Sequence, residues 1–253
     1  MRITANNTFV LVGAVSAWSL LLPEIAAAMH IADGILPLSW AAIWYAITVP
    51  FIALGLRRMQ TLAAEDFAMK PLVGLIAAIV FIVSCMPVPV PFVGTCSHPC
   101  GTAIAAVLLG PLVAVPVAFA ALLLQALFLA HGGLSTLGAN VLAMGVVSSF
   151  AAYGAFRSLR RFGAGLGMAG FCAGLAADWA TYLTTSAELA LGLQGAESFL
   201  SLFVTIAIAF VPTQLPLGIL EGAMTAGVVV LLSRKRPDLL VKMRILKAGE
   251  VNA

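Results

Sequence analysis

The chain has 253 residues, of which 62% are hydrophobic and only 9% are charged. A soluble globular domain carries about 25% charged residues, so this composition excludes a soluble protein and indicates an integral membrane protein in contact with lipid. The net charge of +3 is small, and no basic face suited to nucleic acid is apparent, so we expect no nucleic-acid partner.

Residues 1–28 have the features of a secretory signal peptide. A short n-region contains Arg2, the apolar stretch "TFVLVGAVSAWSLLLP" follows, and three alanines at 26–28 match the small-residue cleavage pattern. Cleavage after Ala28 would make Met29 the mature N-terminus, on the outer side. The alternative is that the segment is an uncleaved first transmembrane helix.

A free N-terminus at Met29 would create a chelating group. Three nitrogens could then coordinate one ion through chelate rings of five and six members. They are the Met29 amine, the deprotonated His30 amide and the His30 imidazole. Nitrogen ligands in a square plane suit Ni(II) or Cu(II), and imidazole suits several first-row metals. The three donors leave one corner open, which predicts a second histidine as ligand.

The rest of the chain predicts an all-α protein with seven membrane spans, because repeated apolar runs approach the ~20 residues that cross a bilayer. Residues 38–56 and 71–90 form the first two spans, and the prolines of "MPVPVPF" then end the helix. Residues 102–131 form two short helices of about 15 residues each, meeting at Gly110 and Pro111. The remaining spans are 138–156, 164–185 and 198–233, and we expect Pro212 and Pro216 to kink or break the last one.

Positive charges set the expected orientation. Apart from Arg2, the 13 Lys and Arg residues fall in three groups, at 57–70, 157–161 and 234–247. Such grouping is typical of cytoplasmic segments. We therefore expect a domain at 29–233 with its N-terminus outside, followed by a basic cytoplasmic tail at 234–253.

The three histidines, His30, His98 and His131, all lie at the outer ends of the expected spans. His98 ("TCSHPC") and His131 ("LAHGGLST") stand in segments rich in Gly, Ser, Thr and Pro, as expected of backbone that lines a cavity. We predict His98 as the fourth metal ligand. His131 is either a further ligand or a group that orients a ligand.

Other polar residues are candidates for supporting roles. Asp33 could fix the N-terminal loop or orient the imidazole, and Ser97 and Asn140 could hydrogen-bond to the ligands or add to them. Asp178 and Glu221 are ionisable groups inside expected spans, which makes them functional candidates as well as candidates for satisfaction by a neighbouring helix. Gly163/Gly167 and Gly218/Gly222 have the spacing of close helix packing.

Four segments resemble the CbiM/NikM family, the substrate-capture membrane components of energy-coupling-factor cobalt and nickel transporters. They are "MHIADGILP", "GTCSHPCGTAIAAVLLGP", "LLQALFLAHGGLSTLGANVLAMG" and "PTQLPLGILEGAMTAGVVVLL". The resemblance implies seven helices, an N-terminus inside the protein core, and a metal held by Met29, His30 and His98. It also implies a transmembrane coupling protein, a pair of cytoplasmic ATPases and often a small accessory membrane protein as partners.

The implied substrate is Co²⁺ or Ni²⁺, with cobalt favoured, in the cytoplasmic membrane of a bacterium or archaeon. Cys96 and Cys100 beside His98 depart from the small residues common in the family, and a zinc site built on them lacks an obvious fourth ligand. No Walker A stretch is present, so ATP hydrolysis for active transport should take place on a partner chain. The resemblance implies a transporter subunit and not an enzyme.

Two other functions are compatible with the residues. A membrane haem or quinone protein could use His98 and His131 as axial ligands. An intramembrane hydrolase could use Ser97 or Ser135 with a histidine, although the spacing does not match a G-x-S-x-G elbow. The resemblance implies that this chain binds neither haem nor nucleotide.

Overall fold

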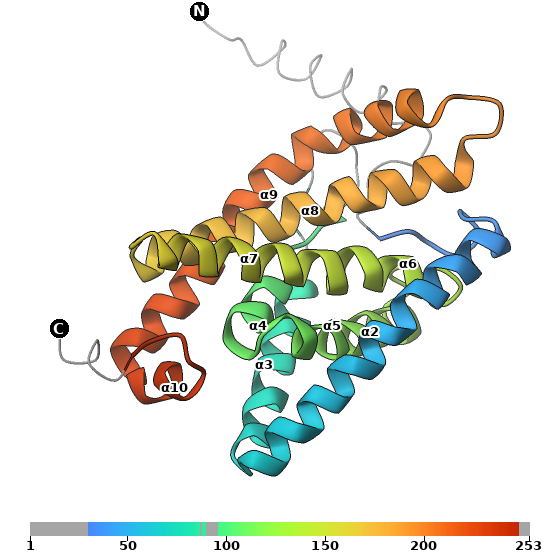
Figure 1. The fold of residues 1–253 in the computed structure, drawn as a ribbon. Coiled ribbons are helices and arrows are strands. Elements are labelled where there is room, and N and C mark those ends of the chain that lie inside the picture. Colours follow the sequence, from blue (N-terminus) through green and yellow to red (C-terminus); the bar gives the residue numbers. More distant parts are fainter. Residues whose placement is uncertain (1–29, 87, 90–95, 248–253) are drawn as a thin grey trace, which may run out of the picture.

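The computed structural model describes residues 30–86, 88–89 and 96–247, and the predicted leader and Met29 lie outside them. The described part is predominantly helical, as expected (Figure 1). Its elements are α2 (Leu38–Glu65), α3 (Met69–Ser84), β1 (Val88–Pro89), β2 (Cys96–Ser97), α4 (Thr102–Leu109), α5 (Pro111–Phe128), α6 (Leu137–Val141), the π-helix η2 (Leu142–Val147), α7 (Ser148–Arg161), α8 (Leu166–Leu193), α9 (Phe199–Lys235) and α10 (Pro237–Lys242).

Several helices are suited to a bilayer. Among the described residues, four helical runs are long and apolar enough to cross a membrane: α2, α5, the continuous run Leu137–Arg161, and α9. The shorter α3 is also apolar. The chain is therefore a multi-pass membrane protein.

Two helices extend well beyond their predicted ends. α2 continues past Arg57 and Arg58 to Glu65, and α8 continues to Leu193 through most of the stretch predicted as an outer loop. Both extensions consist largely of Ala, Leu, Glu, Gln, Met and Arg, which are strong helix formers. A change from apolar to polar residues marks where a helix meets water or headgroups, and it does not end the helix.

The predicted break at Gly110 and Pro111 is confirmed, but the two helices differ in length. Gly110 has φ +87°, a conformation that favours glycine, and Pro111 then occupies the first turn of α5. α4 has only 8 residues, all of them buried, whereas α5 has 18. α4 is therefore about 12 Å long and α5 about 27 Å.

The proline-containing segments differ from expectation. α3 ends at Ser84, six residues before its predicted end, and a two-residue antiparallel pairing of β1 with β2 follows. α9 runs for 37 residues with Pro212 and Pro216 inside it, so neither proline breaks it. Membrane helices tolerate proline where neighbouring groups satisfy the freed backbone carbonyls.

α8 and α9 pack closely along one side of the molecule, and α7 lies between α8 and the α4–α5 pair (Figure 1). A side chain at Gly222 would meet the Phe171 carbonyl, and one at Gly174 would meet the Glu221 carbonyl. A side chain at Gly218 would meet the Trp179 ring, so the close-packing role of Gly218 and Gly222 is confirmed. Gly163 instead occupies the α7–α8 turn with φ +84°, so its predicted packing role is wrong.

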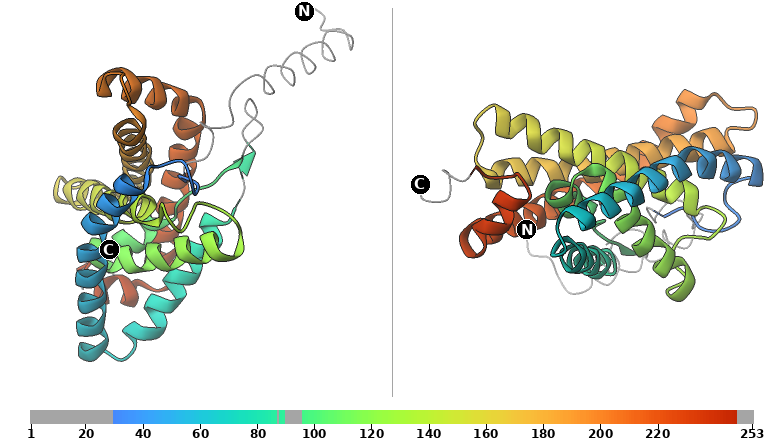
Figure 2. Two further views of the ribbon diagram at one scale, coloured as in Figure 1. Left: turned by 90° about the vertical axis from the view of Figure 1, so that its right-hand side faces the viewer. Right: turned by 60° about the horizontal axis from the view of Figure 1, so that its bottom comes forward.

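The three basic groups meet at one end of the molecule. Arg58, Arg157, Lys242 and Arg244 line one cavity of about 450 Å³, together with the end of α4 and the start of α5. Lys242 pairs with Asp66, and Arg157 donates a hydrogen bond to the Arg244 carbonyl. Figure 2 shows α10 at this end, near the α7–α8 turn.

Candidate metal centre

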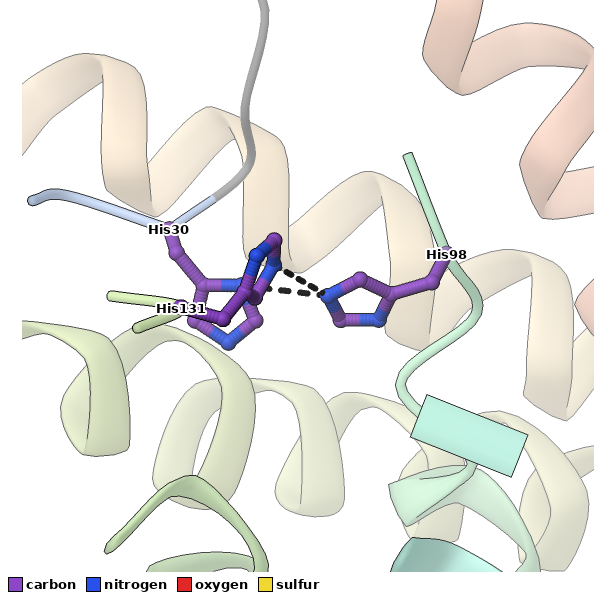
Figure 3. A group of neighbouring side chains, drawn as sticks. All are labelled: His30, His98 and His131. Carbon is purple, nitrogen blue, oxygen red and sulfur yellow. Dashed lines mark hydrogen bonds between the residues drawn. The ribbon is translucent and has the colours of Figure 1, made fainter. Parts of the chain in front are cut away.

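Three histidines from distant segments converge. His30 precedes α2, His98 lies between β2 and α4, and His131 follows α5. His98 Nε2 is 3.1 Å from His30 Nδ1 and 2.9 Å from His131 Nε2. One ligand atom from each ring lies within 4.8 Å of the others, and Figure 3 shows the His98 ring directed at the other two.

The environment favours neutral imidazoles. His30 is 4% exposed and His98 is 5% exposed. Burial, followed by the nearby His98 and His131, holds the pKa of His30 well below its usual value. Burial likewise lowers the pKa of His98 to about 4, and it lowers the pKa of His131. Neutral rings have free lone pairs, which a metal ion requires.

Asn140 holds the backbone next to His30. Its Oδ1 accepts from the Ile31 N–H at 2.8 Å, and its Nδ2 donates to the Ile31 carbonyl at 3.0 Å. The Thr136 hydroxyl donates to the same carbonyl. Asn140 therefore supports the His30 segment through the backbone, because both of its amide atoms are engaged there.

Asp33 joins the N-terminal loop to the segment after His131. Its carboxylate accepts from the Leu134 and Ser135 N–H groups and from the Ser135 hydroxyl. The Ser135 hydroxyl bond is the main cause that lowers the pKa of Asp33. A side chain at Gly133 would overlap the Asp33 carboxylate, so only glycine permits this approach. These contacts correspond to the first of the two roles expected of Asp33, fixing the N-terminal loop.

Sequence reasoning missed Gln125 of α5, which is 1% exposed. Its side-chain nitrogen donates to the Ser84 carbonyl, and its backbone carbonyl accepts from the His131 N–H. A side-chain hydrogen bond with Gln125 acts to raise the pKa of His30, opposing burial. The sequence feature that could have identified Gln125 is a glutamine within an otherwise apolar run.

Asp178 and Glu221 do not belong to the three-histidine group; they lie close to each other and are buried. Glu221 accepts from the Cys100 and Gly101 backbone N–H groups, at 3.1 Å each. Neither Asp178 oxygen has a hydrogen-bond partner among the described residues. Cys100 is buried but does not belong to the three-histidine group.

Some predicted residues cannot be placed in the site. Met29 lies outside the described residues. Cys96 and Ser97 form β2, and the description of that strand covers only their backbone.

Known proteins resemble this chain over nearly its whole length. The family described as "Cobalt uptake substrate-specific transmembrane region", CbiM, matches residues 30–239. A cobalt transport protein CbiM of Geobacter sulfurreducens is 65% identical over 91% of this chain and 67% of its own length. One from Sorangium cellulosum is 57% identical over 87% of this chain and 97% of its own length.

Solved structures agree with these relatives. A crystal structure of a transition metal transporter has a TM-score of 0.70 and 25% identity, covering 85% of this chain and 99% of its own. A truncated transition metal transporter has a TM-score of 0.69 and 26% identity, with 81% and 98% coverage. The family match, the close relatives and the shared fold together show that this chain belongs to the CbiM family of cobalt transport proteins.

Proposed function

We propose that this chain captures Co²⁺ or Ni²⁺ outside the cytoplasmic membrane, as the substrate-specific component of an energy-coupling-factor transporter. The observation that carries the proposal is the convergence of His30, His98 and His131 from three segments. The names of the close relatives favour cobalt as the ion.

The spacing of the nitrogens suits adjacent ligands of one small ion. With metal–nitrogen bonds of about 2.0–2.1 Å, neighbouring nitrogens at right angles lie about 2.9 Å apart. The two contacts of His98 measure 3.1 and 2.9 Å. Moreover, His30 presents Nδ1 to His98, and Nδ1 is the ring nitrogen that closes a six-membered chelate with its own amide nitrogen.

The complete ligand set in this proposal is the Met29 amine, the His30 amide and Nδ1, and His98 Nε2. His131 is close enough to act as a further ligand or to hydrogen-bond to His98. Signal peptidase cleavage after Ala28 frees the Met29 amine on the outer side. Seven spans (α2, α3, α4, α5, the α6–α7 run, α8 and α9) then leave the C-terminal tail in the cytoplasm.

Partner chains supply the energy. A transmembrane coupling protein and a pair of cytoplasmic ATPases, with a small accessory membrane protein, drive release of the ion. Membership of a transport family supports this part of the proposal, and the absence of a Walker A sequence from the chain is compatible with it.

The geometry does not favour a haem between His98 and His131. Axial imidazoles on opposite sides of an iron need nitrogens about 4 Å apart, by analogy with other metal–imidazole bonds. Here the two Nε2 atoms are 2.9 Å apart, which leaves no room for the iron and its macrocycle.

The test combines intact mass and metal content on one membrane-purified sample. We expect a mature start at Met29 and about one cobalt or nickel per chain. In a matched variant, Ala26→Leu with Ala28→Leu, loss of the small residues should block cleavage, and bound metal should fall accordingly. Metal retained by a chain that still begins at Met1 would contradict the proposed ligand set.

A further inference from the structure

A buried carboxylate of α9 accepts two hydrogen bonds from the segment that carries His98. Glu221 is 1% exposed. Its Oε2 accepts from the Cys100 N–H and its Oε1 from the Gly101 N–H, both at 3.1 Å. Both oxygens are therefore engaged with two consecutive residues, and the first of these lies only two positions after His98.

The segment bound by Glu221 directly precedes α4. The first N–H groups of a helix have no partner within the helix, and a negative charge there interacts favourably with the helix dipole. Gly101 turns the chain with φ +70°, and a side chain on it would press against Val83 of α3. Glu221 is the acceptor that the structure shows for both of these N–H groups.

Glu221 is held rigidly on its own side. Its backbone carbonyl lies against Gly174 of α8, where even a methyl group would overlap it. Gly218, about one turn before Glu221, packs against Trp179 of α8, and Gly222, the next residue after Glu221, packs against Phe171 of α8. The position of the carboxylate is consequently set by the α8–α9 pair.

We propose that Glu221 is a positioning residue that fixes His98 for metal binding by holding the backbone of Cys100 and Gly101. The inference rests on the proposed function, in which His98 is a metal ligand.

The test is a double-mutant cycle on the purified, processed chain, with Co²⁺ titrated by calorimetry and the cobalt absorption spectrum recorded. Glu221→Gln keeps the shape but removes the charge and one of the two acceptor oxygens. We expect about a tenfold or greater loss of affinity, as for other groups that orient metal ligands, and a changed spectrum. Glu188→Gln makes the same chemical change at a buried α8 carboxylate and should bind like the wild type.

His98→Ala supplies the other arm of the cycle. If Glu221 acts through His98, adding Glu221→Gln to His98→Ala should cause no further loss. Additive losses, or wild-type binding by Glu221→Gln, would overturn the inference. Wild-type binding by His98→Ala would instead overturn the proposed function.

A folding defect would be recognised by thermal unfolding of each variant. Should Glu221→Gln fail to fold, Glu221→Asp takes its place, because it keeps the charge but withdraws the carboxylate by one methylene. Reduced affinity in Glu221→Asp that disappears in the His98→Ala background supports the positioning role, and unchanged affinity contradicts it.

Discussion

Asn140 illustrates how much of the histidine cluster depends on side chains outside the three histidines. Its amide both accepts from and donates to the backbone of Ile31, directly after His30. Only a carboxamide offers a donor and an acceptor in this arrangement, since an ionised carboxylate cannot donate.

We expect Asn140→Asp to lower the free energy of unfolding by about 1–3 kcal/mol, because the Ile31 carbonyl keeps the Thr136 hydroxyl but faces a buried carboxylate oxygen in place of its second donor. Metal affinity should fall about tenfold or more as His30 shifts. Thermal unfolding and Co²⁺ calorimetry measure the two effects.

Ser149→Ala is the matched control for Asn140→Asp. The Ser149 hydroxyl is buried and has no partner among the described residues, so its removal should be neutral or slightly stabilising. Unchanged metal affinity in Asn140→Asp would show that Ile31 does not set the position of His30.

Residue patterns identified the histidines, Asp33 and Asn140 but not the contacts that connect them. Ile31 and Asn140 are 109 positions apart, and no local periodicity reports such a pairing. Gln125 was missed for a related reason. Its role depends on Ser84 and His131, which only the fold brings near it.

At the scale of the elements, the packing of α8 against α9 depends on glycines, which have no side chain. Gly174→Ala would place a methyl group into the Glu221 carbonyl, so the helices must separate. We expect a loss of about 1–3 kcal/mol in the free energy of unfolding, the usual cost of overpacking.

The control is Gly154→Ala on α7, where the added methyl meets nothing within 4 Å. Alanine is the better helix former by about 1 kcal/mol, so this variant should be slightly more stable. The two glycine variants are compared by thermal unfolding in the same detergent. Equal stability of the two variants would mean that the close contact between α8 and α9 does not contribute to the free energy of unfolding.

Helix ends were less predictable than helices. The break at Gly110 and Pro111 was predictable because it depends on local backbone chemistry. The ends of α2 and α8 were not predictable from hydropathy. Hydropathy indicates whether a segment lies in lipid or in water, whereas a helix continues as long as its backbone hydrogen bonds do. The π-helical η2 and the β1–β2 pairing left no local signal that we recognised.

At the scale of the whole molecule, the histidine cluster and the basic cavity occupy opposite ends. α5 begins at Pro111 in the cavity wall and ends shortly before His131. α2 begins shortly after His30 and carries Arg58 to the cavity. If basic residues face the cytoplasm, the histidines face the outside.

Reporter insertions test this orientation. Alkaline phosphatase requires disulfides that form only outside the cytoplasm. We expect phosphatase joined after Lys247 to be inactive and phosphatase inserted after Gln194 to be active. The reverse pattern would place the histidine cluster on the cytoplasmic side and contradict capture from outside.

α4 connects those two ends, since it starts just after His98 and its last residues, Val107 to Leu109, line the basic cavity. α4 is only about 12 Å long, compared with a hydrocarbon core of about 30 Å, so little more than two helical turns separate the segment that carries His98 from the basic cavity.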